Sequence, residues 1–247
     1  MSVGEPILIG RGVTRRFGGL VAVNAVDLDI REGEIFGLIG PNGAGKTTLF
    51  RLLSGVYRPS AGSIALRGQE IGGRTAHAVV AMGIATTHQI VRPFPEMSVE
   101  KNILVGVLYG RQHLRGHSAD AEVDRILELT ELAPHRATLG RSLTLARRKR
   151  LEVARALATR PDVLLLDEVA AGLNPTESAR MVDLIRRIRD SGVTIVMVEH
   201  VMKAIMSLSD RIMVMDLGRR IALGPPADIA KDTAVITAYL GERPVAS

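Results

Sequence analysis

The 247-residue sequence contains no cysteine and no tryptophan, and it has three tyrosines and four phenylalanines. The absence of cysteine excludes disulfides, thiolate metal ligands and cysteine nucleophiles, and it leaves the cellular compartment open. So few aromatic side chains argue against a platform on which the bases of single-stranded nucleic acid stack. We therefore expect no nucleic acid among the partners of this protein.

Long apolar runs are also missing. The longest, such as residues 163–166, stop at a carboxylate, whereas a helix that spans a bilayer needs about 20 apolar residues. Residues 1–10 contain no basic leader of the kind that begins a secretory signal peptide. We expect neither a signal peptide nor a transmembrane span, so any association with a membrane requires a partner.

The composition indicates a globular protein with a large core. Hydrophobic residues make up 46% of the chain and charged residues 23%, which argues against a disordered chain. The length fits one large domain or a domain with an inserted lobe. The net charge of +6 attracts polyanions in general, and a membrane surface or a nucleotide would satisfy it as well as DNA.

The most informative segment lies between an apolar run at residues 35–39 and a helical pattern at residues 49–53. It matches G-x-x-x-x-G-K-[ST] and consists of Gly40, Pro41, Asn42, Gly43, Ala44, Gly45, Lys46, Thr47 and Thr48. The glycines let the backbone turn its N–H groups inward, and the helix N-terminus adds a partial positive charge. We expect this phosphate loop to bind a nucleotide, with Lys46 on the β- and γ-phosphates and the Thr47 hydroxyl on Mg²⁺.

Three apolar runs predict buried parallel strands, and each ends in polar residues. Lys46 and Thr47 follow the first strand, Asp167 and Glu168 end the second, and His200 follows the third. Ligands of open α/β sheets bind at the carboxyl ends of the strands, so we expect these residues to share one cleft. Asp167 would hold Mg²⁺, and Glu168 would polarise an attacking water. His200 would contact the γ-phosphate or orient that water.

Phe17 is a candidate for the base-binding side of the same site. Residues 7–30 predict two strands, and Phe17 lies in the turn between them. The second strand alternates apolar and acidic side chains, which is typical of a half-exposed antiparallel strand. A nucleotide site needs a ring that stacks on adenine, and few rings are available in this chain.

A helical lobe interrupts the α/β pattern. Residues 93–155 carry no strand signal, whereas they predict one helix from Ser98 and a second at residues 119–132. A third helix, residues 145–159, begins with the basic run 147–150, which we expect to form its solvated face. The predicted fold class is α/β. The expected domains are a nucleotide-binding core at residues 1–92 and 156–247, and an inserted helical subdomain at residues 93–155.

The order of these motifs closely resembles the ATPase subunits of ABC transporters over nearly the whole chain. The likeness rests on the phosphate loop, Gln89, residues 143–147, residues 163–168 and His200. Within that family, the sequence is most similar to the ATPases of branched-chain amino-acid importers. That finer likeness rests on residues 16–23, 150–161, 171–175 and 238–241.

The resemblance implies a P-loop NTPase (RecA-like) core with an antiparallel β-subdomain and an inserted helical subdomain that carries a signature loop. It implies that Phe17 stacks on adenine and that residues 40–48 wrap the phosphates. Gln89 would bind Mg²⁺ and couple the site to the membrane partner, Glu168 would be the catalytic base, and His200 the switch histidine. Such subunits pair head to tail, so each signature loop contacts the ATP of the other subunit.

This chain departs from the family pattern in the signature loop. The family sequence is usually Leu-Ser-Gly-Gly-Gln, and here it is Leu143-Thr144-Leu145-Ala146-Arg147. Thr144 keeps a hydroxyl for a γ-phosphate, whereas the Cβ of Ala146 restricts close approach and Arg147 replaces an amide. We predict a weakened ATP site on the partner subunit. The two sites would be unequal if the partner is a different ATPase. Val169 also stands where the family usually has proline, and Asn174 where many members have Asp.

The functional hypothesis is an ATPase that uses ATP and Mg²⁺ to power import of branched-chain or related amino acids. Its partners would be transmembrane permease subunits, a second ATPase subunit and, indirectly, a solute-binding protein. It would lie at the cytoplasmic face of the cell membrane. The sequence leaves urea or amide import and lipid export open.

A soluble ATPase in iron–sulfur cluster assembly is the main alternative. A chromosome-maintenance protein would need a long coiled coil between Thr47 and Thr144, and no heptad run is present. A small-molecule kinase would need a second substrate site, and the carboxylate pair with His200 fits water activation better.

Overall fold

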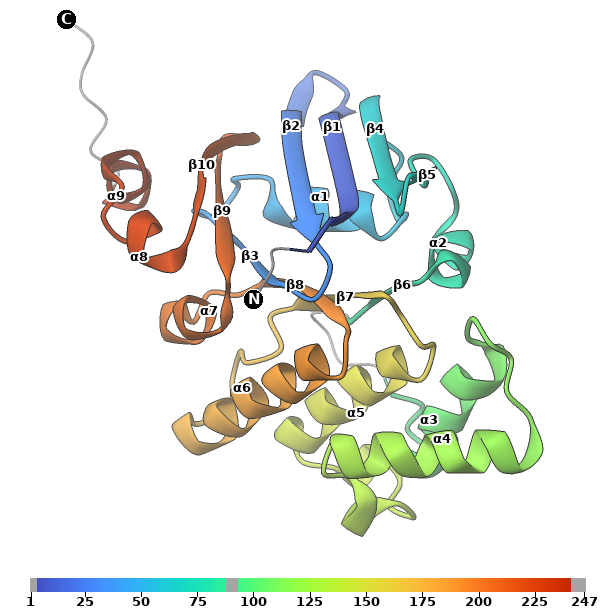
Figure 1. Cartoon of the computed structure of the whole chain (residues 1–247). Helices are drawn as coiled ribbons and strands as arrows, with labels where there is room; N and C mark the ends of the chain where they lie inside the picture. The colour runs from blue at the N-terminus through green and yellow to red at the C-terminus, as the bar shows by residue number, and fades with distance from the viewer. Residues whose placement is uncertain (1–3, 88–92, 241–247) are drawn as a thin grey trace, which may run out of the picture. The chain divides into compact units, whose positions relative to one another are not determined.

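The computed structural model describes residues 4–87 and 93–240. The chain divides into two compact units. Figure 1 shows the ribbon of the whole chain with its helices and strands labelled. The first unit comprises residues 1–76 and 196–247, and the second comprises residues 77–195. The helical region predicted at residues 93–155 falls within the second unit.

An antiparallel sheet forms one part of the first unit. Its strand order is β2-β1-β4-β5, with bounds β1 Pro6–Phe17, β2 Leu20–Arg31, β4 Ala61–Leu66 and β5 Gln69–Glu70. The long hairpin β1–β2 follows from the alternation of buried and exposed residues that β2 shows along its length. The two predicted strands at residues 7–30 are confirmed. The prediction that Phe17 lies in the turn between them is wrong by one residue, because Phe17 is the last residue of β1 and pairs with Leu20.

The phosphate loop belongs to a second group of strands in the first unit. Strand β3 (Ile35–Ile39) is buried at all five positions and pairs in parallel with β9 (Arg211–Asp216). Strand β10 (Arg219–Gly224) pairs antiparallel with β9. The mixture of parallel and antiparallel pairing with helices confirms the α/β class. The helices of this unit are α1 Lys46–Leu53, α7 Met202–Leu208, α8 Pro226–Ile229 and α9 Thr233–Leu240.

The second unit combines a short parallel pair with a helical bundle. Strand β6 (Ile84–Thr86) pairs in parallel with β7 (Val163–Asp167), and the unit boundary at residue 195 falls within β8 (Thr194–Val198). The helices are α2 Ala76–Met82, α3 Val99–Tyr109, α4 Gly116–Leu129, α5 Leu145–Leu157 and α6 Pro175–Asp190, with 3-10 turns at Ala133–His135 and Gly140–Ser142.

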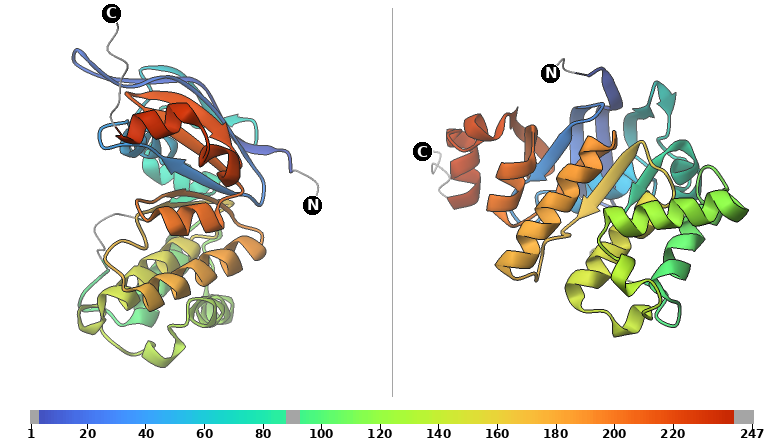
Figure 2. Two further views of the ribbon diagram at one scale, coloured as in Figure 1. Left: turned by 90° about the vertical axis from the view of Figure 1, so that its left-hand side faces the viewer. Right: turned by 60° about the horizontal axis from the view of Figure 1, so that its bottom comes forward.

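Helices α3, α4 and α5 enclose one apolar core in the second unit. Figure 2 shows the ribbons of these helices in green to yellow. Ile103, Val123, Ile126 and Leu151 are among its fully buried members. Helix α4 begins three residues earlier than predicted and ends at Leu129, because Thr130 leaves helical geometry and its hydroxyl bonds the Ile126 carbonyl. Ser98 caps α3 as predicted, by accepting the Lys101 N–H.

The prediction of a solvated basic face on α5 is wrong for two of its four residues. Lys149 and Arg150 are buried, at 7% and 8% exposure. The Arg150 guanidinium donates to the Thr130 carbonyl at 3.2 Å and to the Glu131 carboxylate, and the latter bond lowers the pKa of Glu131. A buried charge is tolerated where such partners replace water, and the helical pattern alone could not reveal them.

In the described part of the chain, every helix is too short or too polar to cross a bilayer.

Candidate functional site

The phosphate loop joins β3 to α1 in the first unit. Gly40, Gly43 and Gly45 have φ angles of 149°, 80° and 99°, values that side chains rarely adopt. Helix α1 begins at Lys46, and the first N–H groups of a helix have no acceptors inside it. No side chain caps this end, because its N-cap residue is Gly45. The loop therefore presents an N-terminus prepared for an anion.

Two of these glycines are also required by close backbone neighbours. A Cβ on Gly40 would lie 2.1 Å from the Met215 carbonyl oxygen, and one on Gly45 would lie 2.3 Å from that of Ala22. The Gly218 N–H donates to the Ala44 carbonyl at 3.0 Å, so the turn between β9 and β10 is bonded directly to the loop. These contacts fix the curvature of the loop before any ligand binds.

Lys46 lies over the loop from which it extends. Its side chain is 6% exposed, and its Nζ donates to the carbonyls of Gly40 at 2.7 Å and Pro41 at 2.9 Å. An ammonium group held beside the backbone N–H groups of the phosphate loop suits the β- and γ-phosphates of a nucleotide. The residues present therefore fit a triphosphate.

The remaining loop residues differ in exposure. Ala44 is buried, Pro41 and Thr48 are half-buried, and Asn42 and Thr47 are exposed. The Thr47 hydroxyl is thus available as an oxygen ligand for a hard cation such as Mg²⁺.

Phe17 lies in an aromatic and cationic cluster of the first unit. Its ring is 38% exposed and meets the Tyr57 ring edge-on, with centroids 5.3 Å apart. The Arg15 guanidinium stacks 4.6 Å from the Phe17 centroid and 5.4 Å from that of Tyr57. Arg51, on α1, donates to the Tyr57 hydroxyl at 3.0 Å. The ring that was expected to stack on adenine is thereby held in place by its neighbours.

Of the two predicted carboxylates in the second unit, Asp167 is the last residue of β7 and Glu168 follows it, and both are half-buried. The Asp167 N–H donates to the hydroxyl of the buried Thr87 at 3.1 Å. Glu168 has a φ of +49°, a strained value for a residue with a side chain, and its carbonyl accepts the Lys149 ammonium at 2.7 Å. Strain retained at a predicted catalytic position is consistent with a functional constraint.

Lys149 and Thr87 contact the two predicted carboxylate residues, and neither was among the predicted site residues. Lys149 was expected on a solvated face of its helix. The sequence offered only a weak signal for either contact, namely a lysine next to an apolar helix face and a hydroxyl residue two positions before Gln89.

The signature loop forms the start of α5 in the second unit. Thr144 is exposed, caps the helix, and accepts the Arg147 N–H at 3.5 Å. Ala146 is half-buried, and Arg147 is exposed. Together with Arg150 and Arg180, these residues help to line a small cavity of about 190 Å³. Asn174 has a structural role beside it, as the N-cap of α6 in a capping box with Glu177.

The structure distributes the predicted site residues between the units. Phe17, residues 40–48 and His200 belong to the first unit, whereas Thr144, Ala146, Asp167 and Glu168 belong to the second. His200 is exposed and lies two residues after the end of β8. Gln89 lies outside the described residues. The shared cleft and the predicted domain boundaries both stay predictions.

Comparison with known proteins adds independent information. The family model described as ABC transporter matches residues 23–171, and one described as branched-chain amino acid ATP-binding cassette transporter matches residues 219–244. The chain is 42% identical over 254 residues to the high-affinity branched-chain amino acid transport ATP-binding protein LivG of Salmonella typhimurium. That alignment covers 96% of this chain and 99% of LivG.

Solved structures agree with the sequence matches. A nucleotide-free ATP-binding cassette from an ABC transporter superposes with a TM-score of 0.87 and 25% identity, over 96% of this chain and 100% of that chain. The ADP conformation of an ATP-binding cassette of an ABC transporter gives 0.85 and 25%, over 96% and 99%.

Proposed function

Because this chain belongs to the ABC transporter family and is one of its ATP-hydrolysing subunits, we propose that it drives the import of branched-chain or related amino acids. The observation that carries this proposal is the 42% identity to LivG over nearly the full length of both chains. The match at residues 219–244 supports the same subfamily.

In the first unit, the loop N–H groups and Lys46 would bind the phosphates of ATP, and Phe17 would stack on adenine. The structure supports these roles through the glycine curvature and the position of the Lys46 ammonium. His200 would orient the attacking water or contact the γ-phosphate.

In the second unit, Glu168 would accept a proton from the attacking water. The water oxygen would bond to the γ-phosphorus while the bond between that phosphorus and the bridging oxygen of ADP breaks. Lys149 would hold the backbone of Glu168, and Thr87 that of Asp167. Thr47, Asp167 and Gln89 would supply oxygen ligands to Mg²⁺. When bound, Mg²⁺ would neutralise part of the phosphate charge.

Transport requires other subunits. Membership of the family implies permease partners and pairing of two ATP-binding subunits. We propose that a solute-binding protein delivers the amino acid to the permeases, and that this chain lies at the cytoplasmic face of the membrane. Thr144 and Ala146 would face the ATP of the second subunit, where Ala146 and Arg147 would weaken that site.

The test is uptake by the assembled transporter. The complex with its permeases and binding protein is reconstituted in vesicles, and ATP-dependent uptake of labelled leucine is measured. Glu168→Gln should keep ATP binding and lower hydrolysis about 10²-fold or more, together with uptake. Hydrolysis without uptake of any aliphatic amino acid would refute the proposed substrate. Co-purification with a soluble scaffold in place of permeases would refute the transport role.

The same complex tests the inequality of the two sites. Glu168→Gln in this chain is compared with the matching substitution in the second ATPase subunit. We expect the substitution in this chain to cause the larger loss of ATP hydrolysis. The ATP site of this chain faces the signature loop of the partner, which lacks the weakening residues Ala146 and Arg147. Equal losses would contradict the inequality.

A further inference from the structure

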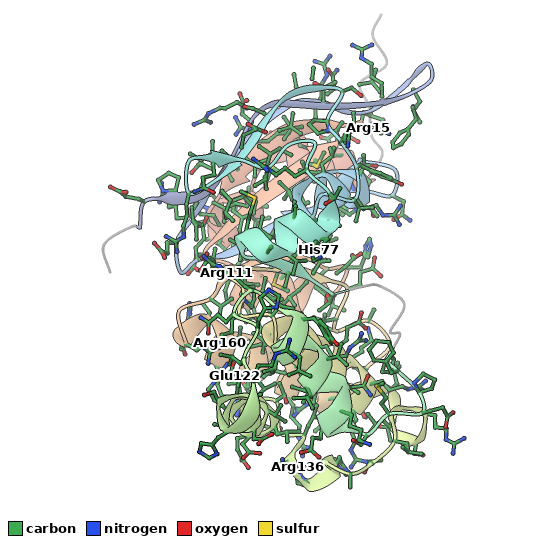
Figure 3. The ribbon with its side chains drawn as sticks, turned by 90° about the vertical axis from the view of Figure 1, so that its right-hand side faces the viewer. Arg15, His77, Arg111, Glu122, Arg136 and Arg160 are labelled. Carbon is green, nitrogen blue, oxygen red and sulfur yellow. The ribbon has the colours of Figure 1, made fainter. Side chains whose placement is uncertain are left out.

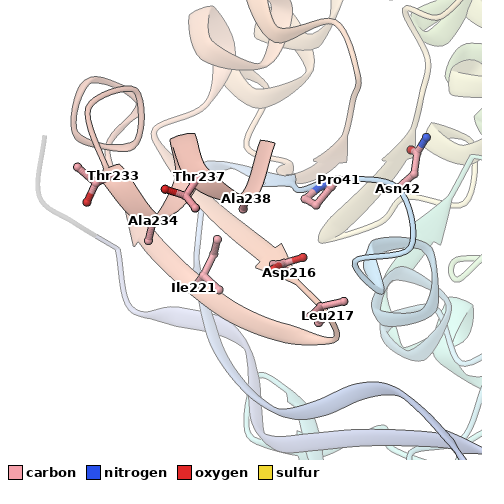
Figure 4. Close-up of a pocket in the computed structure, with 9 residues that line it drawn as sticks. All are labelled: Pro41, Asn42, Asp216, Leu217, Ile221, Thr233, Ala234, Thr237 and Ala238. Carbon is pink, nitrogen blue, oxygen red and sulfur yellow. The ribbon is translucent and has the colours of Figure 1, made fainter. Parts of the chain in front are cut away.

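A second cavity, of about 550 Å³, lies beside the phosphate loop in the first unit (Figure 4). Its size is within the range of small-molecule sites. Three parts of the chain line it: the loop, the β9–β10 hairpin and α9. The lining residues among those described are Pro41, Asn42, Asp216, Leu217, Ile221, Thr233, Ala234, Thr237 and Ala238.

The polar side chains of this cavity have no partners among residues 4–87 and 93–240. Asn42, Asp216, Thr233 and Thr237 make no side-chain hydrogen bond or ion pair with the residues that the structure describes. Asp216 is the one charged side chain of the described lining, and no basic side chain accompanies it. The cavity therefore favours a cation, and it offers two hydroxyls and an amide for further hydrogen bonds.

The rest of the lining is apolar. Ile221, Leu217 and two alanines of α9 form a surface that suits a short aliphatic chain. Leu217 is 62% exposed and has a φ of +45° at the tip of the hairpin, followed by Gly218 at +78°. These angles are the ones that a two-residue hairpin turn requires, and they leave the Leu217 side chain exposed and available to an apolar ligand.

The walls of the cavity are bonded to the phosphate loop. The hairpin contributes the Gly218 N–H to the Ala44 carbonyl at 3.0 Å, and the Met215 carbonyl fills the space against Gly40. On the other wall, the Tyr239 hydroxyl of α9 lies next to the Gly40 backbone N–H. Burial raises the pKa of this hydroxyl, and the hydrogen bond from Gly40 only partly opposes that effect. A ligand in the cavity would touch Pro41 and Asn42 directly and would brace the loop through both walls.

We propose that this cavity binds a small aliphatic amino acid and that its occupation slows ATP hydrolysis. The ammonium group would pair with Asp216, the carboxylate would accept hydrogen bonds from Thr237 and Asn42, and the aliphatic chain would pack on Ile221. The choice of an amino acid rests on the proposed function. The transported solute would then restrain its own import once it accumulates on the side of this subunit.

Binding is tested first on the full chain, by calorimetry and NMR titration with L-leucine. Isoamylamine, which keeps the ammonium and the aliphatic chain, should also bind, whereas 4-methylpentanoate, which lacks the ammonium, should not. Asp216→Asn should weaken leucine binding at least tenfold, and Thr237→Val should weaken it less. Asp228→Asn, an exposed position on α8 outside the lining, is the matched control. Absence of leucine binding at millimolar concentration, or binding that Asp216→Asn leaves unchanged, would overturn the inference.

Regulation is tested on the assembled transporter. Leucine added on the ATP side should lower the ATPase rate of the wild type severalfold and leave the rate of Asp216→Asn unchanged. Normal leucine uptake with no inhibition would overturn the regulatory inference and leave the proposed function intact. Leucine binding at Asp216 in a complex that imports no amino acid would refute the proposed function and leave the cavity assignment standing.

Discussion

The phosphate loop and the signature loop are both short segments that start a helix, and they prepare that helix end in different ways. Helix α1 begins after Gly45, at φ +99° and with no side-chain cap. Helix α5 begins after Thr144, at φ −64°, and the Thr144 hydroxyl already accepts one of its first N–H groups. The first helix end is left for an external anion, whereas the second is partly satisfied by its own residues.

This difference explains why one motif is typical of its family and the other departs from it. The phosphate loop depends on backbone space that a single Cβ would fill. The start of α5 has ordinary backbone angles, so it accepts alanine and arginine without a change of fold. The fold therefore tolerates departures at the signature loop.

The largest expected effect is that of Gly45→Ala, which tests the first half of the comparison. The new Cβ would collide with the Ala22 carbonyl at a strained φ, so we expect loss of ATP binding and destabilisation by about 2–4 kcal/mol. Calorimetric titration with ATP and denaturant unfolding measure the two effects. Gly73→Ala is the control, because Gly73 also has a positive φ but open space around it. If Gly45→Ala bound ATP as tightly as Gly73→Ala does, the phosphate loop would not depend on the absence of a Cβ at Gly45.

A smaller effect, about tenfold on kcat, is expected for Lys149→Met. Without the ammonium, the Glu168 carbonyl loses a hydrogen bond worth about 1–3 kcal/mol, and its strained backbone relaxes. Because Lys149 acts through Glu168, KM for ATP should stay near the wild-type value. Lys149→Arg should restore part of the rate. A change in KM alone would argue against a positioning role.

A change of a few fold is expected when the signature loop is made more typical. Ala146→Gly with Arg147→Gln should raise hydrolysis at the partner's site, since the Cβ and the long cation are removed. The substitutions are made in a complex that also carries Glu168→Gln in this chain, so that the remaining hydrolysis comes from the partner's site. An unchanged or lower rate would show that the departure is harmless.

The smallest effect on activity concerns the helical bundle behind the signature loop. Glu122 on α4 is 3% exposed and pairs with Arg125 and Arg160, both at 2.7 Å. Glu122 and Arg160 are labelled in Figure 3. Burial alone would raise the pKa of Glu122, but the two arginines together lower it to about 2. Because the folded pKa lies below the unfolded value of 4.5, the stabilisation is present above pH 4.5 and is lost as the pH falls toward 2.

Glu122→Gln should therefore cost about 2 kcal/mol at pH 7, after allowance for the solvent around both arginines, and should flatten the acid dependence. Unfolding by urea between pH 7 and 3 measures this, and the exposed Glu128→Gln is the control. ATP affinity should not change at pH 7. A parallel loss of ATP binding would mean that the bundle also shapes the phosphate loop.

The sequence predicted those parts of the site that depend on local patterns. The phosphate loop, the strand that ends at Asp167 and the helix that begins at Leu145 each carry their own signals, and all three elements form as expected. Contacts between distant segments could not be predicted. Examples are the Met215 carbonyl against Gly40 and the Lys149 ammonium on Glu168.

The burial of Lys149 and Arg150 shows why such contacts matter. A run of four basic residues is usually solvated, and only the fold reveals a carbonyl and a carboxylate that replace water. The surroundings of Phe17 were hidden for the same reason, since Tyr57 comes from a separate turn of the chain.

The placement of the tyrosines has a practical consequence for spectroscopy. With no tryptophan in the chain, its intrinsic fluorescence comes from Tyr57, Tyr109 and Tyr239. Tyr57 touches Phe17, and Tyr239 lies at Gly40, whereas Tyr109 is 68% exposed on α3 and supplies a steady background. Two of the three emitters thus adjoin the residues assigned to adenine and phosphate. Nucleotide binding should be visible as a change in the protein's own emission, without any label.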